Sequence, residues 1–147
     1  MLKRCGIKIE KTSKDTIIGL SNGKRFTVVI KRRVKRKLQE DFRRQGKPQL
    51  FYYRTFMAGV ALLIKYAEIE NAQEIVIDRE YSGKEKMFRS MFFEMAGKYF
   101  KNVPEVRIEE IGRRSKAHIV SYETMKGKIK PDKEITYNDI RRLSLRQ

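Results

Sequence analysis

The chain of 147 residues contains one cysteine, one histidine and no tryptophan. A single cysteine, Cys5, cannot form a disulfide within the chain, and with His118 it leaves too few ligands for the usual zinc sites. A catalytic cysteine–histidine pair would rest on one residue of each type. No apolar run is long enough to cross a bilayer, and the opening segment MLKRCGIKIE lacks the apolar centre of a signal peptide. We therefore expect a soluble, cytoplasmic protein with no membrane partner.

Negative charge is also scarce relative to positive charge. The chain has 35 Lys and Arg against 18 Asp and Glu, which gives a formal net charge of +17. Such an excess costs self-repulsion in the folded state, so it more often reflects a polyanionic partner than a need of the fold. A thermophile-like composition explains many of the charges but predicts balanced signs. The surplus therefore predicts nucleic acid, either RNA or DNA, as the partner.

The first thirty residues have the pattern of three antiparallel strands. The segment CGIKIEK (5–11) alternates apolar and charged residues, which is typical of a strand with one solvent-facing side. The segments TIIGL (16–20) and RFTVVI (25–30) flank Asn22 and Gly23, the preferred pair for a tight hairpin turn. Together these segments predict a three-stranded antiparallel meander.

The remainder of the chain alternates helical periodicity with short apolar runs. Apolar residues recur at helical spacing among Lys and Arg after the third strand, and the next helix is almost continuously apolar, as for a helix laid across a sheet. We expect, in order, helices from residues 31 and 49, a buried strand over 74–78, a helix over about 84–100, a strand over 106–111 and a helix over 116–127.

The hydrophobic content of 40% supplies one core, so we expect a single domain over residues 1–130. Residues 131–147 are expected to form a basic C-terminal tail. In this tail Thr136 is followed three residues later by Asp139, a spacing similar to a capping box. The spacing predicts a short terminal helix that is prone to fray.

This order of elements predicts an α/β protein with a mixed five-stranded sheet, in which three antiparallel strands precede two strands joined by helices. Over roughly residues 5–127 the order resembles the ribonuclease H-like fold, which nucleases, resolvases and integrase cores share. The resemblance rests on topology. It implies an active site in which clustered carboxylates hold two metal ions, Mg²⁺ or Mn²⁺, for phosphodiester cleavage.

The resemblance also implies where the carboxylates should lie. Asp78 ends the strand after the crossover helix, where the family has an acid. Elsewhere the match is partial: Glu10 is the only carboxylate on the expected first strand, Thr55 or a neighbour occupies the place of the helix glutamate, and His118 begins the last helix. Two interpretations of Asp78 stay open. It binds a metal together with Glu10, Glu80 or His118, or it accepts hydrogen bonds from the backbone of the following turn.

Basic segments give a firmer signal than the carboxylates. Residues 31–47 contain nine Lys or Arg and two acidic residues, and as a helix with Val34, Leu38 and Phe42 facing inward they could neutralise phosphates without reading bases. The candidate phosphate contacts are Arg33, Lys35, Arg36, Lys37, Arg43 and Arg44 in this segment, Arg113, Arg114 and Lys116 before the last helix, and Lys126, Lys128 and Lys130 after it.

These observations predict a nucleic-acid-binding protein with a ribonuclease H-like fold that contacts the phosphate backbone. Two alternatives stay open. The first is a metal-dependent nuclease or resolvase with a reduced acidic site, in which Asp78, Glu10 and His118 would act in catalysis and Asp78 and Glu80 would bind Mg²⁺ or Mn²⁺. The second is a structural protein of the ribosome or of another RNA complex. Only the nuclease would require a cofactor.

Overall fold

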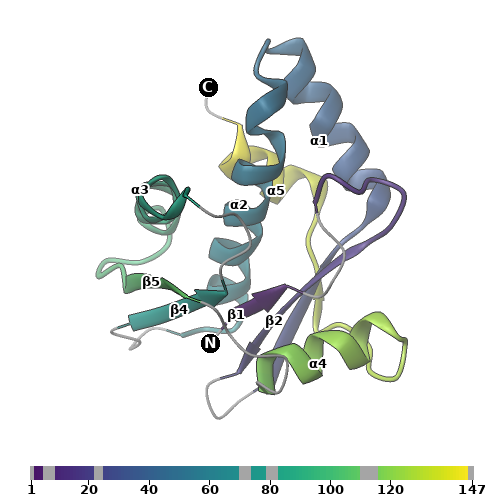
Figure 1. Ribbon diagram of the computed structural model, residues 1–147, viewed down its shortest axis with the longest axis vertical. Helices are drawn as coiled ribbons and strands as arrows, with labels where there is room; N and C mark the ends of the chain where they lie inside the picture. The colour runs from purple at the N-terminus through teal and green to yellow at the C-terminus, as the bar shows by residue number, and fades with distance from the viewer. Residues whose placement is uncertain are drawn as a thin grey trace.

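The computed structural model describes residues 2–4, 9–21, 25–69, 74–78, 83–109 and 116–145, with the side chains of residues 2–4, 116–118 and 121 left out. The described part has an α/β fold, as predicted (Figure 1). Its strands are β1 (Leu2–Arg4), β2 (Thr16–Ser21), β3 (Arg25–Ile30), β4 (Glu74–Asp78), β5 (Glu105–Glu109) and β6 (Lys133–Glu134). Its helices are α1 (Arg32–Arg44), the short 3-10 helix η1 (Pro48–Leu50), α2 (Phe51–Tyr66), α3 (Glu85–Ala96), α4 (Lys116–Met125) and α5 (Tyr137–Ser144).

The described strands form one mixed sheet in the order β5-β4-β1-β2-β3-β6. Strands β1, β2 and β3 are antiparallel, whereas β4 runs parallel to β1 and β5 runs parallel to β4. The two strands of the predicted hairpin and the predicted buried strand therefore belong to one sheet and meet through β1, whereas the predicted turn at Asn22 and Gly23 lies outside the described residues. The predicted strand number was wrong, because β6 adds a sixth strand beside β3. Two residues are too few to leave an alternating pattern in the sequence.

The first strand lies earlier in the chain than the alternation predicted. Strand β1 covers Leu2–Arg4, whereas Ile9 and Glu10 lie in a turn in which the N–H of Thr12 donates to the Glu10 carbonyl at 3.1 Å. Residues 5–8 lie outside the described part. Ile9 is nevertheless fully buried. An apolar residue is found here because the turn covers the core, and not because it lies on the inner face of a strand.

Helix α2 crosses one face of the sheet and carries most of the core (Figure 1). An added Cβ at Gly59 would lie 2.9 Å from Ile18 Cδ1 and 3.1 Å from Ile30 Cδ1, so the helix backbone lies directly on β2 and β3 at this point. Helices α1, α3 and α5 also pack around α2, and α4 covers the opposite face of the sheet. None of the described helices has both the length and the apolarity of a membrane span.

The short helix predicted from the capping spacing is present as α5. The Thr136 hydroxyl accepts a hydrogen bond from the Asp139 N–H at 3.2 Å, and Ile140 and Leu143 are buried against the core. Arg54 of α2 donates to the carbonyl of Ser144 at 2.5 Å, which satisfies one of the last carbonyls of the helix. Tertiary packing as well as the cap therefore holds this segment.

Candidate nucleic-acid interface

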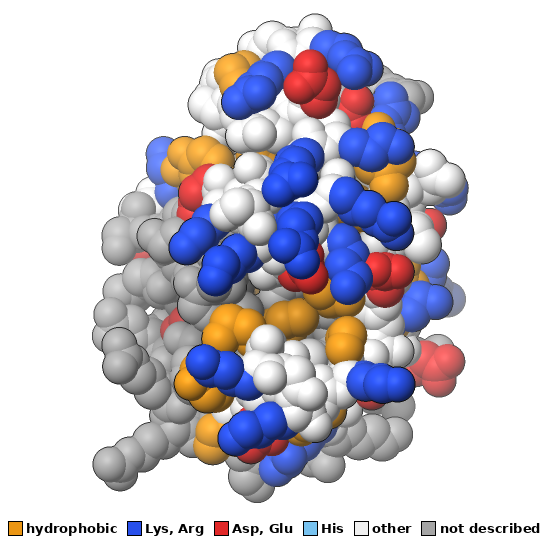
Figure 2. Space-filling view, turned by 90° about the vertical axis from the view of Figure 1, so that its right-hand side faces the viewer, with side chains coloured by type: hydrophobic (Ala, Val, Ile, Leu, Met, Phe, Trp, Pro, Cys, Tyr) orange, Lys and Arg blue, Asp and Glu red, His pale blue; other side chains and the backbone are white. Residues whose placement is uncertain are grey.

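Helix α1 divides into a buried side and a cationic side. Val34, Leu38 and Phe42 are buried, as the sequence predicted. At 100° per residue, five of the six exposed cations of α1 occupy an arc of about 120° that includes one acid, Glu40, and the sixth, Arg32, lies just outside the arc. Figure 2 shows Lys and Arg gathered on this face of the molecule. The arc consists of Arg33, Arg36, Lys37, Arg43 and Arg44, which together with Glu40 we name the α1 basic face.

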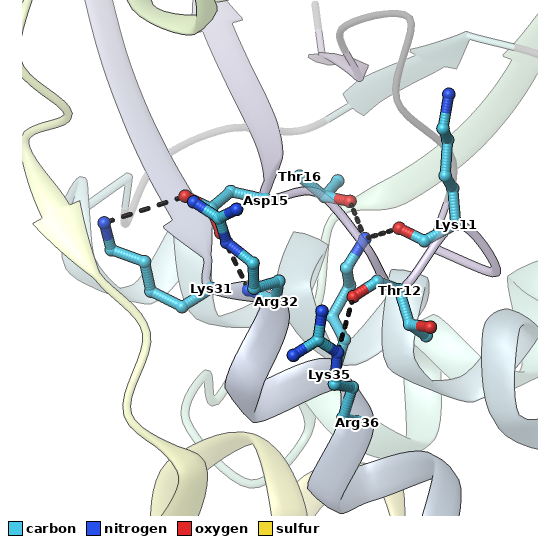
Figure 3. A network of polar contacts seen from close by, with 8 residues as sticks. All are labelled: Lys11, Thr12, Asp15, Thr16, Lys31, Arg32, Lys35 and Arg36. Atoms are coloured by element: carbon cyan, nitrogen blue, oxygen red, sulfur yellow. Dashed lines mark hydrogen bonds and ion pairs between the residues drawn. The ribbon is translucent and has the colours of Figure 1, made fainter.

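One predicted contact belongs to the core instead. Lys35 was expected among the exposed cations of α1, but its side chain is fully buried. Its Nζ donates to the Lys11 carbonyl at 2.7 Å and to the Thr16 hydroxyl at 2.9 Å (Figure 3). The prediction was wrong for this residue because the turn that precedes β2 folds over α1 and supplies oxygen acceptors.

The same turn fixes the start of α1. Asp15 accepts a hydrogen bond from the Arg32 backbone N–H at 2.8 Å, and its carboxylate lies 3.7 Å from Lys31 Nζ and 3.4 Å from Arg32 Nε (Figure 3). Arg36 Nε donates to the Thr12 carbonyl at 3.1 Å. Asp15 thus places a negative charge at the positive end of the helix dipole, where a bound phosphate could otherwise lie.

The C-terminal half of α1 is fixed to α5 through Asp41. Its carboxylate accepts a hydrogen bond from the Tyr137 hydroxyl and lies 3.8 Å from Arg44 and 3.6 Å from Arg141. Burial, followed by this hydrogen bond, raises the pKa of Tyr137. Lys37 Nζ lies 4.3 Å from the centroid of the Tyr137 ring. Specific hydrogen bonds and ion pairs therefore fix both ends of the α1 basic face.

A groove lies beside the start of α1, between α4 and the outer face of β2 and β3. Its volume is about 540 Å³. Ile17 and Val29, which pair across β2 and β3, and the partly buried Met125 of α4 form a small apolar cluster here. The groove, which we name the basic groove, is lined by Ser13, Lys14, Asp15, Ile17, Val29, Lys31, Arg32, Thr124, Met125, Lys126 and Pro131.

Sequence reasoning found only part of this surface. Lys14, Lys31 and Arg32 were not singled out, because the groove joins a turn, a strand end and a helix that lie far apart in the chain. Lys126 was predicted and lines the groove, while Lys128 and Lys130 are exposed just beyond it in the chain. Of the predicted group before α4, Arg113 and Arg114 lie outside the described residues. Lys116 begins α4, with its side chain outside the description.

The predicted acidic residues are placed as follows. Asp78 is the last residue of β4, is 6% exposed, and pairs in register with Glu109 of β5. Glu80 lies outside the described residues, and His118 is the third residue of α4 with its side chain outside the description. Among the described residues no three Asp, Glu, His or Cys side chains form a group that could hold a metal ion.

Glu10 lies close to the first turn of α2. Its negative charge contributes to a raised pKa of Tyr52, after the larger effects of the hydrogen bond to Tyr53 and of burial. Thr55, at the place where the resemblance implies a glutamate, is fully buried, and its hydroxyl has no hydrogen-bond partner within the described part of the chain. This position of α2 therefore belongs to the core.

No protein-family model matches the chain, and no curated protein or solved structure matches it either. Within the described part, positive charge gathers on two adjacent surfaces: the α1 basic face and the basic groove next to its N-terminal end.

Proposed function

We propose that this protein binds nucleic acid through the phosphate backbone and uses the α1 basic face as its principal contact. The observation that carries the proposal is the arc of five exposed cations with a single acid on one anchored helix. A helix of 13 residues is about 20 Å long, which corresponds to about six phosphates along one strand of B-DNA. The spacing therefore suits several simultaneous phosphate contacts.

The binding is proposed to be independent of sequence. Arg and Lys side chains that neutralise phosphates fix position on a nucleic acid but read no bases. The overall charge of +17 adds long-range attraction, which raises the rate of encounter with any polyanion. RNA and DNA are both within this proposal.

We also propose a ribonuclease H-like architecture for the sheet. The support is the order β3-β2-β1-β4-β5, with an antiparallel meander on one side of β1 and two strands parallel to β1 on the other. Strand β6 is an addition to that pattern. Nuclease activity is not part of the proposal, because the buried Thr55 occupies the place in α2 where the resemblance implies a metal-bridging glutamate.

The proposal is tested with the triple variant Arg33→Ala, Arg36→Ala and Arg43→Ala, whose side chains are all exposed. Affinity for unrelated oligonucleotides should fall uniformly, and the slope of log affinity against log salt should decrease by about one for each lost phosphate contact. Fluorescence anisotropy over a salt series measures both quantities.

A matched control removes three exposed cations elsewhere: Lys86→Ala, Arg89→Ala and Lys101→Ala in and after α3. In Figure 1 helix α3 lies on the other side of α2 from α1. The control changes net charge equally, so its affinity and salt slope should stay closer to those of the unmodified protein. Equal losses in both variants would show that net charge alone drives binding. An unchanged affinity in the α1 variant, with its thermal unfolding intact, would remove α1 from the interface.

A further inference from the structure

The basic groove offers an apolar surface beside positive charges, and a duplex cannot contact both with its base faces and its phosphates at the same time. Its floor is apolar, formed by Ile17, Val29 and Met125, and Lys14 and Lys126 stand among its lining residues. In a duplex the base faces are stacked inside, so only phosphates and groove edges can reach a protein surface. An unpaired nucleotide offers an exposed base face as well as a phosphate.

We propose that the basic groove takes an unpaired nucleotide, which gives the protein a preference for single-stranded nucleic acid. This inference rests on the proposed function and names the class of its ligand. The groove volume of about 540 Å³ lies within the range of roughly 300–1,000 Å³ found for small-ligand sites. A base packs against the apolar floor, while its phosphates contact the lysines.

The net positive charge of the groove lining favours a polyanion as its ligand. Among the described residues that line the groove, Lys14, Lys31, Arg32 and Lys126 are cationic, and Asp15 is the only carboxylate. Asp15 is already engaged by the Arg32 N–H and by two of these cations. Lys14 and Lys126 are both exposed and form no ion pair with any described residue. Lys126 Nζ lies 5.5 Å from the centroid of the Tyr122 ring, a contact that leaves its charge uncompensated, so these two lysines are the cations most available to phosphate.

The basic groove adjoins the α1 basic face, and together they form one continuous path of positive charge. Lys31 and Arg32 line the groove, and α1 begins at Arg32, so a strand that leaves the groove meets the α1 basic face directly. In Figure 2 the gathered Lys and Arg side chains border exposed hydrophobic side chains on the same face of the molecule. A single strand can follow this path because it bends more freely than a duplex.

The test compares fluorescent oligo(dT) and oligo(U) with a duplex of equal length and mixed sequence, at one salt concentration. The variant is Lys14→Glu with Lys126→Glu, and the control is Lys98→Glu with Lys101→Glu, which makes the same charge change at exposed residues after α3. The groove variant should lose at least about fivefold in affinity for the single strands and less than about twofold for the duplex. The two single strands distinguish RNA from DNA.

A second variant probes the apolar floor without changing charge. Met125→Gln, at a partly buried side chain, should weaken single-strand binding and leave duplex binding unchanged. Equal losses on single strands and duplex, or unchanged single-strand affinity in both groove variants, would overturn this inference while the proposed function stands. If the unmodified protein binds neither ligand, or if the triple variant in α1 binds both as tightly as the unmodified protein, the proposed function itself fails.

Discussion

Lys35 Nζ donates a hydrogen bond to the Thr16 hydroxyl at 2.9 Å, although Lys35 belongs to the most basic segment of the chain. A second hydrogen bond, to the Lys11 carbonyl at 2.7 Å, completes a clamp between α1 and the turn before β2. One charge of the basic segment is therefore structural, and the neighbouring cations are held in place by it. These two hydrogen bonds hold α1 against the turn before β2, and so they stabilise both the α1 basic face and the basic groove.

We predict that Lys35→Met lowers the free energy of unfolding by about 1–3 kcal/mol, because the buried Thr16 hydroxyl and the partly buried Lys11 carbonyl lose a charged donor while the apolar stem is kept. Denaturant titration measures the loss. Lys47→Met is the matched control, since Lys47 is exposed and should change stability by no more than about 0.5 kcal/mol. If both variants are equally stable, the clamp contributes no stability.

Glu40 is the acid within the α1 basic face, and its exposed side chain would repel a phosphate bound there. We predict that Glu40→Gln tightens binding to every nucleic acid by a few fold and leaves stability within about 0.5 kcal/mol. Anisotropy titrations at low and high salt provide the measurement, and the gain should shrink as salt rises. Glu105→Gln, at an exposed position of β5, is the control and should change affinity less. Equal gains in the two variants would contradict a local role for α1.

Tyr66 joins α2 to α5 by donating to the Asp139 carboxylate at 2.8 Å. Burial, followed by this hydrogen bond, raises the pKa of Tyr66 well above its ordinary value. An ionised Tyr66 is therefore disfavoured in the folded state, so its contribution to stability is present below about pH 10 and is lost as the pH rises towards the folded pKa.

We predict that Tyr66→Phe lowers stability at neutral pH by about 1 kcal/mol and makes the decline above about pH 10 shallower. Denaturant titrations between about pH 8 and pH 11 test both effects. Part of the decline should remain, because burial also raises the pKa of Tyr99 and of Tyr137. Tyr122→Phe, at an exposed tyrosine of α4, serves as the control. An identical pH dependence in Tyr66→Phe and the unmodified protein would contradict this assignment.

The fold could largely be predicted because its signals are local. The apolar residues Val34, Leu38 and Phe42 recur at helical spacing and became the buried side of α1. The strand at 74–78 was predicted because its apolar run is short and bounded by polar residues. Strand β6 could not be predicted, since its two residues pair with β3 only through the tertiary fold.

The candidate site was less predictable, because burial of polar side chains depends on distant partners. Lys35 stands among exposed arginines in the sequence, and nothing in that sequence indicates that its amine is buried under a turn. The basic groove brings together Lys14, Arg32 and Lys126, whose separation along the chain hides their proximity. The folded sheet places the end of α4 and the start of α1 at the same end of β2 and β3, and this arrangement forms the groove.

The effect of replacing Asp78 distinguishes a binding protein from a nuclease. Asp78 is buried at the end of β4, in register with Glu109, and we interpret it as the polar end of a core strand. Asp78→Asn should then lower the free energy of unfolding by about 1 kcal/mol and leave nucleic-acid affinity unchanged.

A catalytic Asp78 would behave in the opposite way. Replacing one carboxylate of an acidic cluster relieves repulsion, so Asp78→Asn would leave stability unchanged or raise it while abolishing Mg²⁺- or Mn²⁺-dependent cleavage. We expect the first outcome, because two metal ions normally need a bridging carboxylate and the buried Thr55 stands where the proposed ribonuclease H-like architecture would place it. Denaturant titration and a cleavage assay on labelled RNA and DNA, run on the same preparation, separate the two. Metal-dependent cleavage by the unmodified protein that disappears in Asp78→Asn would show that Asp78 is catalytic.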